Sequence, residues 1–107
     1  MISRIWHGYT SFDNADEYEN LLKEEIFVGI KNRNIIGYNG IQLLRRNLEN
    51  EVEFITIMWF DSIDSVKVFA GEDYENAVVP KKAQLLLTRF DKQSQHYQVR
   101  SSDKIMG

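Results

Sequence analysis

The chain has 107 residues, 43% of them hydrophobic and 27% charged, and a formal net charge of −3. This length suits one domain with a single core, and the acidic balance argues against a nucleic-acid partner, which requires a basic surface. Because the sequence contains no cysteine, disulfides, thiolate metal sites and a cysteine nucleophile are excluded. A reducing cytoplasm is the expected location.

No segment reaches the roughly 20 consecutive apolar residues that a membrane span requires. The first residues, MISRIWHGYT, also lack the apolar run of a secretion signal. We therefore predict no membrane partner and a single domain over residues 1–107. Its core should extend from about 2 to 100, with a frayed tail at 102–107.

The first two predicted elements are a strand and a helix. Alternation over Ile2–Thr10 predicts a strand, whose side chains point to opposite faces in turn. One face carries Ser3, Ile5, His7 and Tyr9, and the other carries Ile2, Arg4, Trp6 and Gly8. Apolar residues at spacings of three and four then predict an amphipathic helix from about Asn14 to Asn32, with Asp13 as its cap.

A hairpin follows, formed by strands at Gly40–Leu48 and Glu51–Phe60 and by the polar turn Glu49-Asn50. The second strand reads EVEFITIMWF and is rich in β-branched and aromatic residues. Both of its faces are largely apolar: Val52, Phe54, Thr56, Met58 and Phe60 form one, and Ile55, Ile57 and Trp59 form the other. Helices in so short a chain can cover one face, so we expect a partner subunit on the second.

Ser62 is the predicted cap of a second helix, which should end at Gly71. Residues 72–79 have no regular pattern. Pro80 suits the first turn of a short helix that continues to Leu87. Gln95–Ser101 is the predicted final strand.

The resulting order is β-α-β-β-α-β, which is the order of the ferredoxin-like fold. This is an α+β architecture in which helices cover one face of an antiparallel sheet. Two such sheets that face each other across a twofold axis would bury the remaining apolar face. We therefore predict a homodimer.

Several segments resemble the antibiotic-biosynthesis monooxygenase domain family, over roughly residues 2–100. These segments are Arg4–Gly8, the helix end Glu25–Phe27, the run Glu53–Ser62 and the stretch Phe69–Phe90. The resemblance implies a dimeric α+β barrel with a pocket between the sheet and the helices of each protomer. Members of the family oxidise polycyclic aromatic phenols with dioxygen and no cofactor, degrade haem, isomerise small molecules, or have no assigned activity.

The haem-degrading branch has an asparagine on the first strand, a tryptophan late in the second helix and a haem-ligating histidine ten positions later. The corresponding positions in this sequence are His7, Phe69 and Val79. Since valine cannot ligate iron, haem degradation is not expected, and His96 in the final strand does not restore the pattern. No histidine and carboxylate pair has metal-ligand spacing. We predict neither a cofactor nor a metal.

Cofactor-free oxygenation requires a base that deprotonates an electron-rich phenol, whose anion then passes an electron to dioxygen. The pocket must be apolar, with a few polar groups that orient the ring. The resemblance and the residues together suggest His7 as the base, because an imidazole titrates near neutral pH, and Tyr9 as a hydrogen-bond donor to the substrate. Trp59, Phe27 and Phe69 are the predicted substrate-binding residues.

Structural alternatives stand beside these assignments. His7 could be a half-buried strand residue bonded to the backbone, and Trp59 and Trp6 could be core or interface aromatics. His96 and its neighbours Tyr97 and Arg100 suit a strand at the dimer contact.

The arginines also have two interpretations. Arg4, Arg45 and Arg46 could bind an anionic ligand, or they could lie on a solvated strand edge paired with Glu51 or Glu53. The sequence favours the second interpretation.

The preferred function is a cofactor-independent monooxygenase that acts on a small aromatic or quinol-like compound. The alternative is a non-catalytic small-ligand-binding or stress-response protein on the same dimeric fold. An isomerase or lyase is a third possibility. The preference depends on family analogy.

Overall fold

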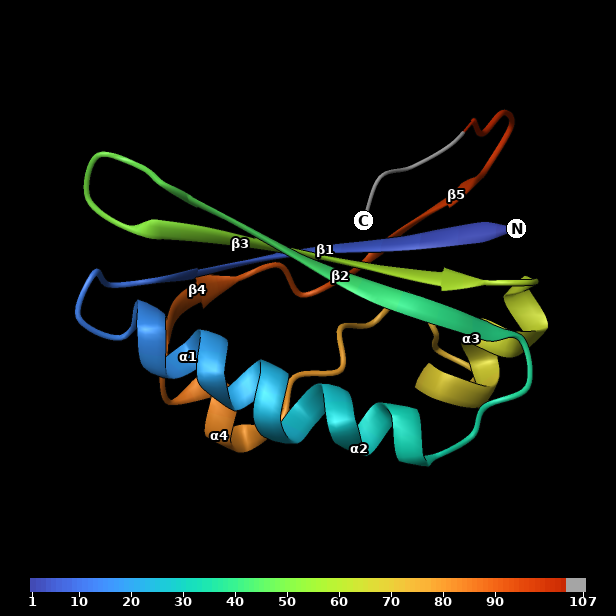
Figure 1. The fold of residues 1–107 in the computed structure, drawn as a ribbon, viewed down its shortest axis with the longest axis horizontal. Helices are drawn as coiled ribbons and strands as arrows, with labels where there is room; N and C mark the ends of the chain where they lie inside the picture. Colours follow the sequence, from blue (N-terminus) through green and yellow to red (C-terminus); the bar gives the residue numbers. More distant parts are fainter. Residues whose placement is uncertain (104–107) are drawn as a thin grey trace.

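An antiparallel sheet forms one layer of the protein, and helices form the other (Figure 1). In this computed structural model, residues 1–103 are described, so 104–107 of the predicted tail lie outside the described residues. The elements are β1 (Ile2–Thr10), α1 (Ala15–Leu21), a π-helical segment (Leu22–Ile26), α2 (Phe27–Asn32), β2 (Tyr38–Asn47), β3 (Val52–Phe60), α3 (Ile63–Ala70), α4 (Lys81–Gln84), β4 (Leu87–Phe90) and β5 (Gln95–Gln98).

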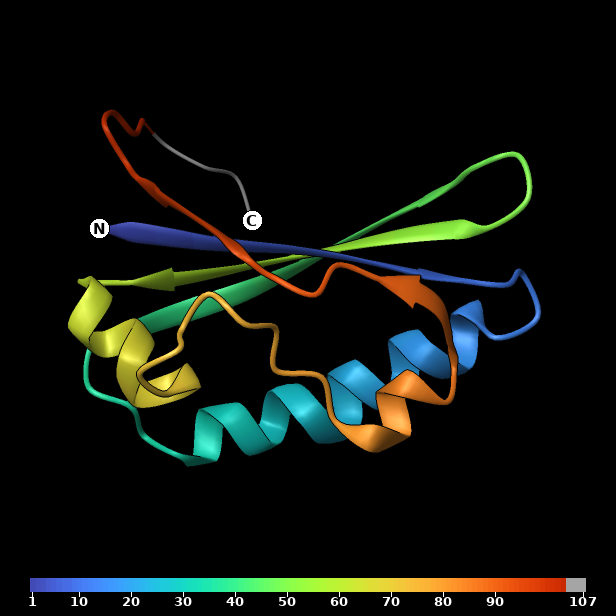
Figure 2. The ribbon, with the colours of Figure 1, turned by 180° about the vertical axis from the view of Figure 1, so that it is seen from behind.

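The strand order is β2-β3-β1-β4, and β5 also pairs with β1. β1 and β3 are paired along their whole length, from Ile2 opposite Phe60 to Thr10 opposite Val52. The predicted α+β, ferredoxin-like arrangement is thereby confirmed, including the hairpin of β2 and β3. All four labelled helices lie on the same side of the sheet in both views (Figures 1 and 2).

The predicted last helix and last strand need correction. The helix ends at Gln84, and Leu87–Phe90 form a strand, β4, that was not predicted from the sequence. β4 pairs with the end of β1 and β5 with its beginning, so the outer position beside β1 is shared by two short strands. β5 itself stops at Gln98 rather than at Ser101.

The long helix predicted over Asn14–Asn32 is present, but its middle turn is π-helical. Its cap is Asn14 rather than Asp13. The Ser11 Oγ accepts a hydrogen bond from the Asn14 amide at 3.2 Å, which stabilises the start of the helix.

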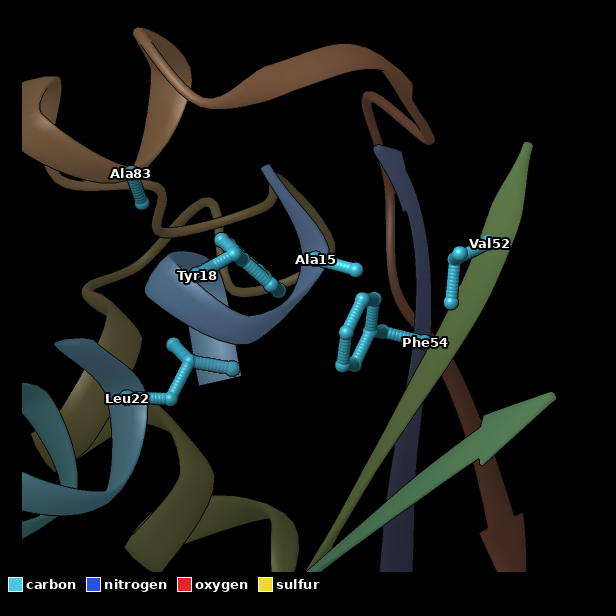
Figure 3. Close-up of a cluster of buried hydrophobic side chains, with 6 residues drawn as sticks. All are labelled: Ala15, Tyr18, Leu22, Val52, Phe54 and Ala83. Atoms are coloured by element: carbon cyan, nitrogen blue, oxygen red, sulfur yellow. The ribbon is translucent and has the colours of Figure 1, made fainter. Parts of the chain in front are cut away.

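The core lies between β3 and this helix (Figure 3). Phe54 and Tyr18 are almost completely buried, and their ring centroids are 4.8 Å apart in an edge-to-face arrangement, which aromatic pairs favour. The six residues of this cluster are Ala15, Tyr18, Leu22, Val52, Phe54 and Ala83. A second cluster, at the other end of the sheet, contains Ile2, Met58, Phe60 and Val66.

Gly37, the residue before β2, lies against α3. Ser62 caps α3 as predicted, since its Oγ accepts a hydrogen bond from the Ser65 amide at 3.3 Å, and Gly71 follows the last helical residue. Gly37 has a φ of +87°, and a Cβ there would lie 2.0 Å from the Ser65 Oγ. Only glycine fits this approach without displacement of Ser65.

The sheet face opposite the helices, here called the open face, is not covered by any element of the described chain in Figures 1 and 2. Alternation along β1 and β3 places Ser3, Ile5, His7, Tyr9, Glu53, Ile55, Ile57 and Trp59 on this face. Ile55, Ile57 and Trp59 are only partly buried. Among residues 1–103, no helix is long and apolar enough to cross a membrane.

Candidate functional site

A cavity of about 70 Å³ lies between the sheet and the helices. From the sheet, its lining residues are Arg4, Trp6, Ile41, Thr56 and Met58. From the long helix, they are Tyr18, Leu22, Ile26, Phe27 and Ile30. The rest of the chain contributes Phe69, Val78, Val79, Pro80, Ala83 and Ser94. The lining is mainly apolar, with one charged side chain. Its volume is well below the roughly 300–1,000 Å³ of typical small-molecule pockets.

That charged side chain is Arg4, which is 3% exposed. Its guanidinium donates to the backbone carbonyl of Tyr74 and, at 3.0 Å, to that of Asn76. It also lies 5.5 Å from the centroid of the Phe69 ring, a cation–π arrangement. Burial lowers the pKa of Arg4 to about 10, which leaves the side chain protonated at neutral pH.

The Arg4 charge has no carboxylate partner in the part of the chain that the structure describes; its polar partners are two carbonyls and an imidazole. The imidazole is His96, whose Nε2 lies 2.9 Å from the Arg4 Nη1. Burial, and next the Arg4 charge, lower the pKa of His96. His96 is therefore neutral at physiological pH and accepts the hydrogen bond from Arg4.

Trp6 forms another wall of the cavity. Its indole Nε1 donates to the Asp91 carbonyl at 2.7 Å, in the turn between β4 and β5. A Cβ on Gly8 would lie 2.7 Å from the Trp6 ring, so glycine at this position makes room for the indole.

A second space, an open groove of about 680 Å³, shares Phe27 and Ile41 with the cavity among its lining residues. The groove runs between α2 and the beginning of β2. Its charged lining residues are Lys23 and Lys31, and no carboxylate lines it.

The structure does not bring the predicted site residues together. Phe27 and Phe69 line the cavity, on the helix side of the sheet. His7, Tyr9 and Trp59 lie on the open face, because they have the opposite parity along β1 and β3 from Arg4, Trp6 and Met58. A single pocket that contains all five residues is therefore not formed within this chain.

His7 and Tyr9 instead take part in a polar cluster at one end of the open face. The His7 Nδ1 lies 3.2 Å from the Glu53 Oε2, to which the Tyr9 hydroxyl donates at 3.3 Å. The Arg46 Nε donates to the other Glu53 oxygen at 2.5 Å, and this bond is the main cause that lowers the pKa of Glu53. Such a carboxylate can orient an imidazole, but no cavity adjoins the cluster among the five described pockets.

Arg45 and Arg46 pair with carboxylates rather than with a ligand site. Arg45 contacts Asp16 at 2.8 Å and Glu19 at 3.1 Å. Arg46 pairs with Glu53, as the sequence predicted for this group of residues. Arg4 was grouped with these two arginines at the sequence level, yet it lies alone in the cavity.

The burial of Arg4 in the cavity was not predicted, although the sequence held a signal. Arg4 lies two residues from Ile2 and from Trp6 along β1, so its side chain points to the same face as theirs, the face that packs against the helices. The π-helical segment and the carbonyls of residues 74–76 had no comparable signal. The residues described, 1–103, contain no cluster of three or more histidine, cysteine or acidic side chains that could hold a metal.

The comparisons with known proteins support the architecture. No protein-family model matches the sequence, and no curated protein matches it. By structure, the chain is similar to a Bacillus cereus protein described as a "putative antibiotic biosynthesis monooxygenase", with a TM-score of 0.66, 12% identity and 97% coverage of both chains. It is also similar to a Deinococcus radiodurans protein of the same description, with a TM-score of 0.65, 14% identity and full coverage of both chains. The resemblance predicted from the sequence is thus confirmed at the level of the fold, which this chain shares with proteins described as antibiotic biosynthesis monooxygenases.

Proposed function

We propose that the protein binds a small, acidic aromatic compound in the cavity between sheet and helices and oxidises it with dioxygen, without a cofactor. The observation that carries this proposal is Arg4, a buried cation that lines an apolar cavity and has no carboxylate partner among the described residues. A buried charge of this kind favours an anionic ligand, because the two charges attract strongly where water is excluded.

The role of Arg4 would be to stabilise the phenolate form of the ligand. An opposite charge within about 4–6 Å lowers the pKa of an acid, so a weakly acidic phenol would release its proton to water at neutral pH. The anion then transfers an electron to dioxygen, and recombination gives a hydroperoxide that loses water. For an anthrone, R₂CH₂ and O₂ give R₂C=O and H₂O: the carbon is oxidised, and one oxygen atom leaves as water.

A second candidate function is binding without catalysis. It is favoured by the absence of any carboxylate or imidazole from the described lining of the cavity. In that case the compound would stabilise the folded protein by mass action and would be released unchanged.

Oxygen uptake with a panel of anthrones and hydroquinones tests the proposal. We expect turnover by the wild-type protein and a large loss with Arg4→Met, with Arg4→Lys between them because it keeps the charge but not the planar fork. Circular dichroism of each variant establishes that it is folded. Ligand-dependent stabilisation without oxygen uptake would support the binding function instead.

The variant His7→Ala tests which face of the sheet carries the reaction. A general base contributes about 10²–10⁴-fold to a rate. If the reaction takes place in the cavity, His7→Ala should leave the rate nearly unchanged. A loss of a hundredfold or more would move the chemistry to the open face, where the structure places His7 and Tyr9.

We also propose that the protein is a homodimer, with the open face as the contact. The partly buried apolar residues of this face, Ile5, Ile55, Ile57 and Trp59, support this proposal. Location in the cytoplasm stays a prediction from the sequence.

A further inference from the structure

Phe27 lines two spaces that differ in size and character. One is the narrow cavity that contains Arg4, and the other is the open groove with Lys23 and Lys31. Ile41, on β2, also lines both spaces. These two shared side chains are the candidates for a boundary between the cavity and the groove.

A π-helical segment leads directly into Phe27. Both Ile26 and Phe27 line the cavity, as neighbours on the apolar stripe of a helix can. They do so where the π-helical segment ends: the Phe27 amide donates to the Leu22 carbonyl, five residues earlier. π-Helical turns are rare and occur frequently at functional sites.

The groove has a charge preference of its own. Lys31 is exposed and makes no ion pair with a described residue, while Lys23 has a long contact of 3.6 Å with Glu19. Two ammonium groups therefore line a groove without a carboxylate, on a protein whose net charge is −3. An anionic group would therefore find complementary charge in this groove.

We propose that the cavity and the groove are two ends of one site, gated by Phe27, and that its ligand is an elongated aromatic acid with a second, permanent anionic group. The phenolic end lies beside Arg4 and the permanent anion, a carboxylate or a sulfonate, lies beside Lys31. This inference rests on the proposed binding at Arg4 and extends it to the substrate class. The groove alone has a volume typical of small-molecule pockets, so displacement of one ring would turn a cavity that is too small into a site of sufficient size.

The charge preference can be tested with two compounds that differ by one carboxylate, 2-naphthol and 6-hydroxy-2-naphthoate. In isothermal titration calorimetry we expect the wild-type protein to bind the carboxylate about fivefold more tightly, the size of one exposed ion pair. Lys31→Gln should abolish this preference and leave the affinity for 2-naphthol unchanged. Lys92→Gln is the matched control, since Lys92 is also exposed but lies between β4 and β5, at the opposite edge of the sheet from β2.

The gate is tested by kinetics. Stopped-flow fluorescence with 2-naphthol should give an association rate constant that rises on the order of tenfold in Phe27→Leu. Ile41→Val removes one methyl group from the β2 side of this boundary and should change the rate in the same direction, which provides a second variant should Phe27→Leu be poorly folded. Unchanged association rates in both variants would overturn the gate.

The outcomes also separate this inference from the proposed function. If both compounds bind in an Arg4-dependent manner but the wild-type protein does not distinguish them, or the preference survives in Lys31→Gln, the elongated site is refuted and the cavity proposal stands. If neither compound binds, the cavity proposal fails and this inference fails with it.

Discussion

Ile57→Asp is the substitution that most directly tests how the protein uses its open face. Ile57 lies opposite Ile5 on β1 and Gln42 on β2, in the middle of the sheet. It is only partly buried within one chain. In a homodimer whose contact is the open face, each copy would bury the rest of this side chain against its partner.

The expected magnitude follows from the symmetry of such a contact. Loss of the apolar burial and introduction of a carboxylate that must lose water would cost about 2 kcal/mol in each copy. A twofold contact counts each substitution twice, so the total is about 4 kcal/mol. Since about 1.4 kcal/mol is a factor of ten in the dissociation constant, the dimer should dissociate about a thousandfold more readily.

Sedimentation velocity and native mass spectrometry at micromolar concentrations would measure the effect. The matched control is Leu85→Asp, which places the same charge on a side chain that is 77% exposed and lies just after α4, in the helical layer. This control should dimerise as the wild-type protein does. The reasoning is refuted if the wild-type protein is a monomer, or if Ile57→Asp dimerises as tightly as the wild-type chain.

Three further predictions concern stability. Phe54→Ala should lower the free energy of unfolding by about 3–5 kcal/mol in urea denaturation, because it empties a fully buried position; a cost below about 1 kcal/mol would contradict the packing. Gly37→Ala should cost about 1–3 kcal/mol and more than Gly40→Ala, since both have positive φ values but only Gly37 lies against another side chain; equal costs would remove the close contact from the explanation. The pKa of His96 is lowered on folding by burial and by the Arg4 charge. Below about pH 6.5, the ordinary pKa of a histidine in the unfolded chain, the unfolded chain therefore binds more protons than the folded protein. Stability should therefore fall from about pH 6.5 downward until the folded-state pKa is passed, and His96→Gln should reduce this decline; an unchanged pH profile would exclude His96 as its source.

Most of the sheet could be predicted from the sequence because a strand has only two faces. The alternation in Glu51–Phe60 identified both faces correctly: Val52, Phe54, Met58 and Phe60 are buried against the helices. The short polar turn before this strand was sufficient to predict its hairpin with β2. The cap and the end of α3 were also predicted correctly, because Ser62 and Gly71 are strong local signals.

The features that were missed depend on tertiary contacts. Leu87–Phe90 is a strand of four residues that pairs with the last residues of β1, and a segment so short has too little periodicity to be identified. The π-helical turn, in which the Phe27 amide donates to the Leu22 carbonyl, leaves no mark in the residue pattern. The break between β4 and β5 begins at Asp91, whose carbonyl accepts the Trp6 hydrogen bond, a contact between residues 85 positions apart.

The distribution of the five candidate site residues over two faces of the sheet could have been read from the sequence. His7 and Tyr9 share their face with Trp59, so these three residues were a consistent set. Phe27 and Phe69 come from helices, and side chains of helices meet only the face of the sheet that the helices cover. Residues from both groups cannot line one pocket within a chain, because the sheet lies between them.

This separation of faces has a consequence for any activity that is found. A ligand in the cavity contacts one chain only, since Arg4, Phe27 and Phe69 all belong to the same protomer. A ligand at His7 would lie on the open face and, in the proposed dimer, between two copies. Activity per chain should therefore be independent of dilution if the cavity is the site, and should fall as the dimer dissociates if the open face is the site. A dilution series of the wild-type protein, with Ile57→Asp as its monomeric limit, distinguishes the two faces without knowledge of the natural substrate.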